Sequence, residues 1–337
     1  MIDVLVAGGG PAGLATAIHA TLAGMEAVVV EPRSAPVDKA CGEGLMPTGV
    51  AALRSLGVRV EGWPLLGIRY VDERRRAQAA FREGPGLGVR RTALHAALAE
   101  RAAEVGVKVV HGRVGGVRQH ADSVEAAGLR ARWLVAADGL HSPLRGLLGL
   151  ELASRAPSRY GQRRHYRVAP WSDFVEVHWA ARAEAYVTPV GEELVGVAVL
   201  SSERRSYEEH LAGFPALLAR LEGPAATSVR GAGPLRQRVS ARVAGRVLLV
   251  GDAAGYMDAL TGEGVSLGLL SARALVGCLR AGRPEAYERA WRRLSLRHRL
   301  LTGALLAARR RPGSARLIVP AAQRLPVVFT ATVNALA

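Results

Sequence analysis

Residues 8–13 read GGGPAG and directly follow the apolar run 2–7. That run is almost continuously apolar, which predicts a parallel strand buried on both faces. The glycines fit the spacing G-x-G-x-x-G: Gly8 permits a tight turn, Gly10 lets the backbone approach a pyrophosphate, and Gly13 lets the next helix pack on the strand. The N-terminus of that helix faces the phosphates. This stretch therefore predicts a strand–turn–helix unit that binds a dinucleotide.

An acidic residue follows the next expected strand, 27–30. Glu31 stands at the end of this strand, at the offset where a carboxylate accepts hydrogen bonds from a ribose diol. A carboxylate here argues against a 2′-phosphate, so NADP is a poor candidate for the resident dinucleotide. The alternative is a tight structural turn, which the strand before it, the helix after it and Glu31 disfavour.

Two further acid-and-glycine turns follow apolar strands much later in the chain. Asp138-Gly139 closes the stretch 133–137, and Gly251-Asp252 closes 246–250. Together with residues 8–13, their order and spacing predict FAD, because a folded FAD touches all three stretches at once. Residues 261–264 (TGEG) then open a helix from Val265, whose free N–H groups would stabilise charge on a reduced flavin. The alternative for this loop is a helix cap alone.

Composition excludes several classes of protein. Of the 337 residues 49% are apolar, and the net charge is +16, yet Lys39 and Lys108 are the only lysines and the arginines are scattered. Scattered charge does not favour nucleic-acid binding, which needs a clustered surface. Two cysteines imply no disulfide framework, and no cluster of metal ligands stands out. The absence of a cleavable leader or a spanning apolar run predicts a cytoplasmic protein.

The element pattern predicts an α/β fold with a Rossmann-like FAD-binding domain around a parallel sheet, a smaller mixed β-sheet substrate domain and C-terminal helices. Helices are expected at 91–105, 207–221 and 265–279. The FAD-binding domain is expected from residues 1–60, 86–152 and 240–285, the substrate domain from 61–85 and 153–239, and the helical segment from 286–337.

These motifs together resemble a family of FAD-dependent enzymes that includes aromatic-hydroxylase-type monooxygenases and geranylgeranyl reductases. The resemblance covers about residues 1–280 and rests on GGGPAG with Glu31, on Arg91, on Asp138-Gly139 and on Gly251-Asp252. It implies that Arg91 lies near the FAD pyrophosphate, although a solvated charge at a helix start is the alternative. The predicted cofactor-binding residues are Gly8, Gly10, Pro11, Ala12, Gly13, Glu31, Arg33, Lys39, Cys41, Arg91, Val114, Asp138, Gly139, Gly251, Asp252, Gly262, Gly264 and Val265.

Residues 39–47 (KACGEGLMP) form the most distinctive local segment. They look like the Lys-x-Cys-Gly-x-Gly segment of the geranylgeranyl reductase branch, which lies near the isoalloxazine ring. The resemblance makes Cys41 and Glu43 the candidate catalytic residues, Cys41 in contact with the flavin and Glu43 as an acid or base. The alternatives are a packed thiol and, favoured for Glu43, an exposed loop carboxylate.

A segment of the expected second domain, 184–191, resembles the family's Tyr-x-x-Pro-x-Gly strand across the substrate pocket. It makes Tyr186, Pro189 and His178 candidate pocket residues. His165 and Trp179 could also line the pocket, and core or strand-surface positions are the alternative for these side chains. The chain lacks the Tyr-x-Trp-x-Phe-Pro form of archaeal-type prenyl reductases and the Trp-x-Trp-x-Ile-Pro form of flavin halogenases. These departures count against prenyl reduction and against halogenation.

The favoured function is therefore a monooxygenase of secondary metabolism that uses NAD(P)H as a transient reductant. It would hydroxylate or epoxidise an apolar or aromatic small molecule through a flavin C4a-hydroperoxide. The alternative is a geranylgeranyl-reductase-like enzyme, which residues 39–44 favour. A third hypothesis is a basic binding module that keeps FAD only structurally. The arginine-rich C-terminal segment, with its run 309–311, could contact a membrane, but a packed helix pair is favoured.

Overall fold

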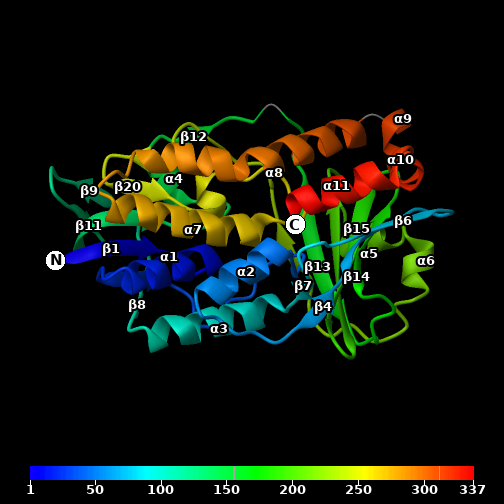
Figure 1. Cartoon of the computed structure of the whole chain (residues 1–337), viewed down its shortest axis with the longest axis horizontal. Coiled ribbons are helices and arrows are strands. Elements are labelled where there is room, and N and C mark those ends of the chain that lie inside the picture. Colours follow the sequence, from blue (N-terminus) through cyan, green and yellow to red (C-terminus); the bar gives the residue numbers. More distant parts are fainter. Residues whose placement is uncertain (155, 311) are drawn as a thin grey trace.

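The computed structural model describes residues 1–337 except Arg155 and Arg311. The molecule is elongated, with one β-sheet toward each end and helices along its side (Figure 1). No helix among the described residues is both long and apolar enough to cross a bilayer. The predicted α/β fold, with a parallel sheet, a second sheet and C-terminal helices, is confirmed.

An eight-stranded sheet holds the glycine motif. Its strands are β19 (Val243–Ala244), β20 (Val247–Leu249), β11 (Leu129–Ala136), β1 (Ile2–Ala7), β2 (Ala27–Glu31) and β8 (Lys108–His111) in spatial order, with β10 (Val124–Ala126) and β9 (Val117–Gln119) added at β11. The five strands from β20 to β8 are parallel. The carboxyl ends of β1, β11 and β20 therefore meet at one edge, which brings together the three turns that follow them.

Helices cover this sheet. α1 (Pro11–Leu22) packs against α3 (Arg91–Glu104) and α7 (Gly264–Arg280), and α2 (Pro47–Ser55) packs on α7. The sequence predicted α3 and α7 to within one residue. It predicted a strand through 246–250, but β20 ends at Leu249 and the chain turns into the short helix η1 (Gly251–Ala254).

A seven-stranded sheet forms the other end of the molecule. Its strands are β17 (Arg230–Ala232), β13 (Tyr160–Tyr166), β16 (Leu194–Ser201), β15 (Ala183–Gly191), β14 (Phe174–Trp179), β5 (Gly67–Val71) and β6 (Arg76–Ala80). All pairs are antiparallel except β14 with β5. A third, small sheet has three strands in the spatial order β3 (Gly44–Leu45), β7 (Gly86–Gly88) and β4 (Trp63–Leu65). A further strand pair joins β12 (Glu151–Leu152) to β18 (Arg238–Val239).

One predicted helix is wrong as a single element. Residues 207–221 form two short helices, α5 (Tyr207–Leu211) and α6 (Pro215–Leu218). Pro215 breaks the helix because its ring clashes with the preceding turn and it has no N–H to donate. Another short helix, α4 (Pro143–Leu147), follows the turn at Asp138-Gly139.

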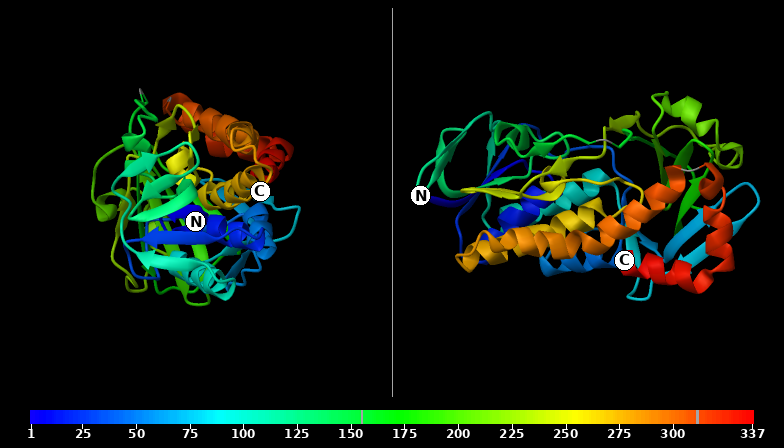
Figure 2. Two further views of the ribbon diagram at one scale, coloured as in Figure 1. Left: turned by 90° about the vertical axis from the view of Figure 1, so that its left-hand side faces the viewer. Right: turned by 90° about the horizontal axis from the view of Figure 1, so that it is seen from above.

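The C-terminal segment connects the two sheets. α8 (Ala286–Arg310) runs along the molecule from the eight-stranded sheet toward the seven-stranded one (Figure 2). α9 (Pro312–Ala315), α10 (Ile318–Arg324) and α11 (Pro326–Leu336) then turn back, and both α10 and α11 pack on β6. The C-terminal Ala337 accepts a hydrogen bond from the Thr48 N–H, at 2.9 Å, so the chain ends between the two sheets (Figure 1).

The division into an FAD-binding domain, a substrate domain and a C-terminal helical segment, with the boundaries expected from the sequence, stays a proposal.

Candidate active site

A cavity of about 980 Å³ lies between the two large sheets. Small-molecule and cofactor sites span about 300–1,000 Å³, so this one is at the large end. Fifteen of the residues singled out from the sequence line it: Gly10, Pro11, Ala12, Arg33, Lys39, Cys41, Glu43, Arg91, Gly139, Tyr186, Gly251, Asp252, Gly262, Gly264 and Val265. Segments up to 250 positions apart in the chain are thus brought together.

Two glycines of residues 8–13, Gly8 and Gly13, form the turn between β1 and α1 without lining the cavity themselves. Gly8 has φ +110°, and a Cβ there would stand 2.5 Å from the Ala137 carbonyl oxygen. A Cβ on Gly13 would stand 1.9 Å from the Gly8 carbonyl oxygen. Both positions therefore require glycine, one for its backbone conformation and one for the contact between α1 and β1.

Two helices direct their N-termini into the cavity. Gly10 is the N-cap of α1 and Glu263 that of α7, and neither N-cap side chain bonds to a backbone N–H of its helix. The first turns of both helices contribute lining residues. The unsatisfied N–H groups and the positive end of each helix dipole make this part of the cavity favourable for an anion.

Buried cations strengthen that preference. The Arg91 side chain is buried, and its Nη1 has no hydrogen-bond partner among the described residues. Burial, with Arg33 nearby, lowers the pKa of the Lys39 ammonium group. Burial also raises the pKa of the Asp252 carboxyl, although Lys39 and Arg91 oppose this. A buried guanidinium nitrogen that lacks a partner beside two uncapped helices fits the diphosphate of FAD.

Four other predicted cofactor residues lie near the turn but outside the cavity lining. Glu31 is buried at the end of β2, where Oε2 accepts from the Gly9 N–H (2.7 Å) and Oε1 from Arg33 Nε (2.7 Å). Burial opposes its ionisation, but the hydrogen bonds from Arg33 and Gly9 outweigh burial and lower its pKa. Asp138 accepts from the Leu144 N–H (3.1 Å) through Oδ2. Gly8 and Gly13 form the turn itself.

Val114 lies elsewhere. It follows β8 and packs in the main hydrophobic core, with 7% of its surface exposed. Val114 is not among the described residues that line the cavity. Its predicted contact with the cofactor stays a prediction.

A buried acid lies at the wall of the cavity. Glu43 has φ +60° and a buried side chain, so the favoured expectation of an exposed loop carboxylate is wrong. Its Oε1 accepts from the Arg91 N–H (2.8 Å), and Oε2 lies 2.5 Å from Nε2 of the fully buried His165. Arg163 Nη2 lies 3.7 Å from Oε1. The carboxylate is therefore surrounded by donors and positive charge.

The imidazole of His165 extends this contact toward the surface. Its Nδ1 lies 3.0 Å from the hydroxyl oxygen of the half-buried Thr227 and 3.2 Å from Arg163 Nη1. Arg163 can only donate, so Nδ1 is the acceptor and the ring proton is on Nε2. That N–H faces Glu43 Oε2, so the imidazole and the carboxyl group hold one proton between them at the wall of the cavity.

Sequence reasoning mentioned His165 only as one of several possible pocket residues and missed Arg163 and Thr227. A signal existed in β13, where Arg163 and His165 are two positions apart and therefore share one face. Nothing local in the sequence says that this face meets residues 39–44. The ion pair between Arg163 and Asp38, at 2.6 Å, joins the two segments.

The second candidate catalytic residue, Cys41, is a neutral thiol. Burial, together with the nearby Glu43, raises its pKa. A thiol that stays protonated is a poor nucleophile, because the thiolate is the reactive form. Its Sγ accepts from the Glu43 N–H at 3.4 Å. Cys41 therefore shapes the loop beside the cavity as a small, weakly polar side chain.

The seven-stranded sheet gives the cavity an apolar wall, although charged residues such as Glu203, Arg204 and Arg230 also line the cavity. The apolar wall includes Ile68, Tyr70, Val175, Val177, Leu200, Leu235 and Leu260, from the seven-stranded sheet and neighbouring loops. Tyr186 also lines it and donates its hydroxyl to the Leu260 carbonyl at 2.8 Å. The other two candidate pocket residues do not line it among the described residues: His178 Nε2 lies 3.1 Å from Glu176 Oε2, and Pro189 lies against Gly88.

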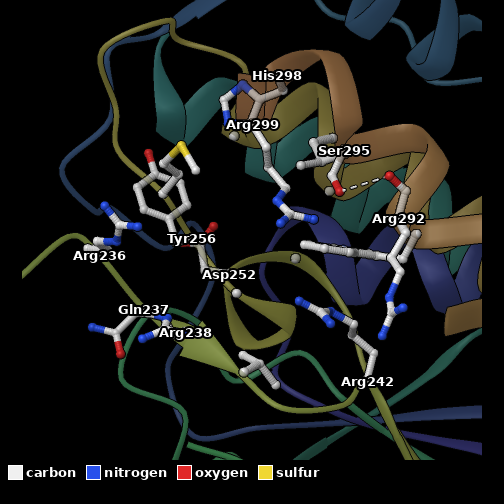
Figure 3. A pocket seen from close by; sticks show the side chains of 18 of the residues that line it. Arg236, Gln237, Arg238, Arg242, Asp252, Tyr256, Arg292, Ser295, His298 and Arg299 are labelled. Atoms are coloured by element: carbon white, nitrogen blue, oxygen red, sulfur yellow. Dashed lines mark hydrogen bonds between the residues drawn. The ribbon is translucent and has the colours of Figure 1, made fainter. Parts of the chain in front are cut away.

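A second cavity, of about 410 Å³, is lined by residues of η1 on one side and of α8 on another (Figure 3). It shares wall residues of η1 and α7 with the first cavity. Glu288 accepts from Arg242 Nη1 (2.9 Å) and from Arg292 Nε (3.1 Å). Five arginines line this cavity and give it a positive potential: Arg236, Arg238, Arg242, Arg292 and Arg299.

The comparisons with known proteins agree with this site. The FAD binding domain family matches residues 1–282. The chain belongs to this FAD-binding family. It is an FAD-dependent oxidoreductase, as the sequence motifs predicted.

Several relatives are similar to this chain, two of them over most of their length and one over part of it. The chain is 30% identical over 333 residues to menaquinone reductase of Mycolicibacterium smegmatis, covering 88% of this chain and 80% of that protein. It is 28% identical over 302 residues to digeranylgeranylglycerophospholipid reductase 1 of Methanothermobacter thermautotrophicus, covering 80% and 74%. It is 31% identical over 160 residues to rifampicin monooxygenase of Rhodococcus hoagii, covering 44% and 33%.

A solved flavoprotein/dehydrogenase from Cytophaga hutchinsonii has the same fold. It superimposes with a TM-score of 0.78 at 18% identity and covers 99% of this chain and 96% of its own. At this identity the likeness concerns the fold alone. The reaction must therefore be argued from the side chains of the cavity.

Proposed function

We propose that this enzyme reduces a carbon–carbon double bond of an isoprenoid chain, with FAD as its cofactor and NAD(P)H as the transient reductant. This reaction was the alternative in the sequence analysis, and we now place it before monooxygenation. The observation that carries the proposal is the buried pair of Glu43 and His165 in a cavity to which the seven-stranded sheet gives an apolar wall.

Saturating a double bond requires a hydride and a proton. Reduced FAD, when bound, supplies the hydride to one carbon and is itself oxidised. The other carbon must receive a proton inside a cavity where water is scarce, which requires a buried acid with its own supply. Glu43 lines the cavity, and the proton held between its Oε2 and His165 Nε2 is the one available for transfer to that carbon.

The same residues stabilise the charge that the proton leaves behind. Once Glu43 is a carboxylate, the Arg91 N–H donates to it and Arg163 lies 3.7 Å away. The apolar lining excludes water and holds a hydrocarbon chain. Two relatives that the chain covers over about three quarters or more of their length are named reductases, one of a quinone and one of a geranylgeranyl lipid, which supports this order of hypotheses.

The test is product analysis without oxygen. The FAD-loaded protein, reduced under nitrogen, is mixed with a prenylated quinone or a geranylgeranyl lipid, and the products are examined by mass spectrometry. After any quinol has been reoxidised in air, we expect the isoprenoid chain of the substrate to have gained two hydrogen atoms. Product that instead gains one oxygen atom, formed only in air and in step with oxygen consumption, would refute the reductase and favour the monooxygenase.

A variant separates the proton donor from a merely structural residue. In Glu43→Gln the side-chain carbonyl can still accept from the Arg91 N–H, but no acidic proton remains. We expect FAD binding to persist while substrate reduction slows by about 10²–10⁴-fold. Glu203→Gln, at a partly exposed carboxylate that lines the same cavity, is the matched control and should keep its rate.

A further inference from the structure

The C-terminal helix α11 is apolar on both of its sides. It contains no charged residue, from Pro326 to Leu336. Phe329 and Val333 face inward, and the Phe329 ring lies 4.7 Å from that of Tyr70. On the other side Val327 and Val328 are 77% and 58% exposed. The polar residues of α11 are Thr330, Thr332 and Asn334, and its outer side still exposes two adjacent valines, which favours a partner at that side.

Neighbouring apolar side chains enlarge this surface. Leu325, at the turn between α10 and α11, is 56% exposed, and Leu317, just before α10, is 58% exposed. We call Leu317, Leu325, Val327 and Val328 the C-terminal apolar patch. Contiguous exposed apolar residues mark an interaction site more often than scattered ones do.

The surroundings of the patch are basic. Residues 289–337 contain ten arginines and neither Asp nor Glu. Arg316 and Arg324 are exposed beside the patch, and Arg310 is exposed at the end of α8. Arg309 does not contribute free charge, because it forms an ion pair with Glu184. The hairpin between β5 and β6, whose strand β6 packs on α10 and α11, adds the exposed arginines 74–76, of which Arg75 is paired with Asp72; Glu73 is also exposed there.

The patch also borders the cavity. Val333 and Leu336, on the inner side of α11, are lining residues of the large cavity. α11 therefore stands between the apolar wall of the cavity and the surface that carries the patch.

We propose that α10 and α11 bind the surface of an anionic lipid membrane, and that the substrate chain enters the cavity from the bilayer beside α11. Apolar side chains at the level of the acyl chains, with arginines toward the headgroups, are typical of interfacial helices. A second copy of this chain is a poor occupant, because its patch carries the same unbalanced arginines and the two would repel. The entry route depends on the proposed function, whereas the membrane contact does not.

The test uses vesicles and the FAD-loaded full chain. The protein is sedimented with vesicles of phosphatidylcholine alone, and with vesicles of phosphatidylcholine and phosphatidylglycerol. We expect binding to the anionic vesicles at least tenfold tighter than to the neutral ones, weakened by salt. Protein that stays in the supernatant with both kinds of vesicle would overturn the proposal.

Variants assign the contact to the patch. In V327D/V328D, binding to anionic vesicles should fall at least tenfold, whereas V109D/V110D, at exposed valines of β8, should bind as the parent does. R316Q/R324Q should lose the preference for anionic lipid. Unchanged flavin absorbance in each variant shows that it is folded. Equal binding by V327D/V328D and V109D/V110D, or a parent dimer that V327D/V328D dissociates, would refute the membrane contact.

Turnover is measured separately, so the two proposals fail independently. If V327D/V328D reduces a short substrate in solution at the parent rate but loses activity on substrate held in vesicles, both proposals are supported. If no isoprenoid substrate is reduced while vesicle binding still depends on Val327 and Val328, the proposed function fails and the membrane contact stands.

Discussion

Replacing Arg91 by methionine tests whether the positive end of the cavity exists to hold a diphosphate. Methionine keeps most of the length and the apolar stem of the side chain but removes the guanidinium. The main-chain N–H of residue 91 still donates to Glu43, since only the side chain changes. The perturbation is therefore confined to one buried cation.

The magnitude follows from the missing partner. Arg91 is 5% exposed, its Nη1 lacks a hydrogen-bond partner among the described residues, and burial lowers its pKa. Hydrogen bonds to charged partners contribute about 1.5–3 kcal/mol, so losing the bond to a diphosphate should raise the Kd for FAD about 10- to 150-fold. The protein without FAD should not lose stability, because an unpaired buried charge is unfavourable there.

The assay is titration of the FAD-free protein, followed by quenching of flavin fluorescence, with thermal unfolding of the same samples. We expect a higher Kd together with a melting temperature of the FAD-free protein that is unchanged or raised. Arg118→Met, on the exposed strand β9, is the matched control and should change neither. A Kd within threefold of the parent, or a melting temperature that falls by several degrees, would show that Arg91 acts as a structural residue.

Glu176 and Gly13 give two further predictions, one on folding stability and one on FAD binding. Burial opposes ionisation of Glu176, but hydrogen bonds from an imidazole, an indole and Arg69 outweigh burial and lower its pKa to about 2. The ionised carboxylate therefore stabilises the folded protein by about 3 kcal/mol above the ordinary pKa of 4.5. This contribution is lost as the pH falls toward 2. Urea unfolding of Glu176→Gln should therefore differ from the parent by about that amount at pH 7, with a gap that narrows below pH 4.5; a gap independent of pH would contradict this. Gly13→Ala should abolish FAD uptake, because its Cβ would stand 1.9 Å from the backbone oxygen of Gly8, whereas Gly277→Ala, with nothing within 4 Å, should be harmless.

The cofactor end of the cavity could be predicted from the sequence because its determinants are local. Each of its turns follows a buried parallel strand, and parallel strands end at the same edge of a sheet. The residues that form each turn lie within six positions of one another, as in GGGPAG. Knowing the strand is therefore enough to place Gly10, Gly139 and Gly251 at one site.

The chemistry of Glu43 could not be predicted in the same way. Its burial depends on His165, 122 positions later, and on the register that aims β13 at residues 39–44. A lone carboxylate between glycines gives no sign of such a partner, so exposure was the reasonable expectation. The break at Pro215 was different, because a proline inside an expected helix is itself a local signal that ends the helix.

These differences locate the specificity of the enzyme. Parallel strands and uncapped helices at one end can hold FAD whatever the reaction, so that end says little about the substrate. His165, the partner of Glu43, comes instead from β13, and the apolar wall comes from its neighbours in the seven-stranded sheet and from α11. An enzyme that kept residues 8–13 but replaced His165 and the inner face of α11 would still bind FAD, yet it would lack the buried pair of His165 and Glu43 on which the proposed reduction depends. Under that proposal, the reaction is determined where the second sheet meets the loop of residues 39–44.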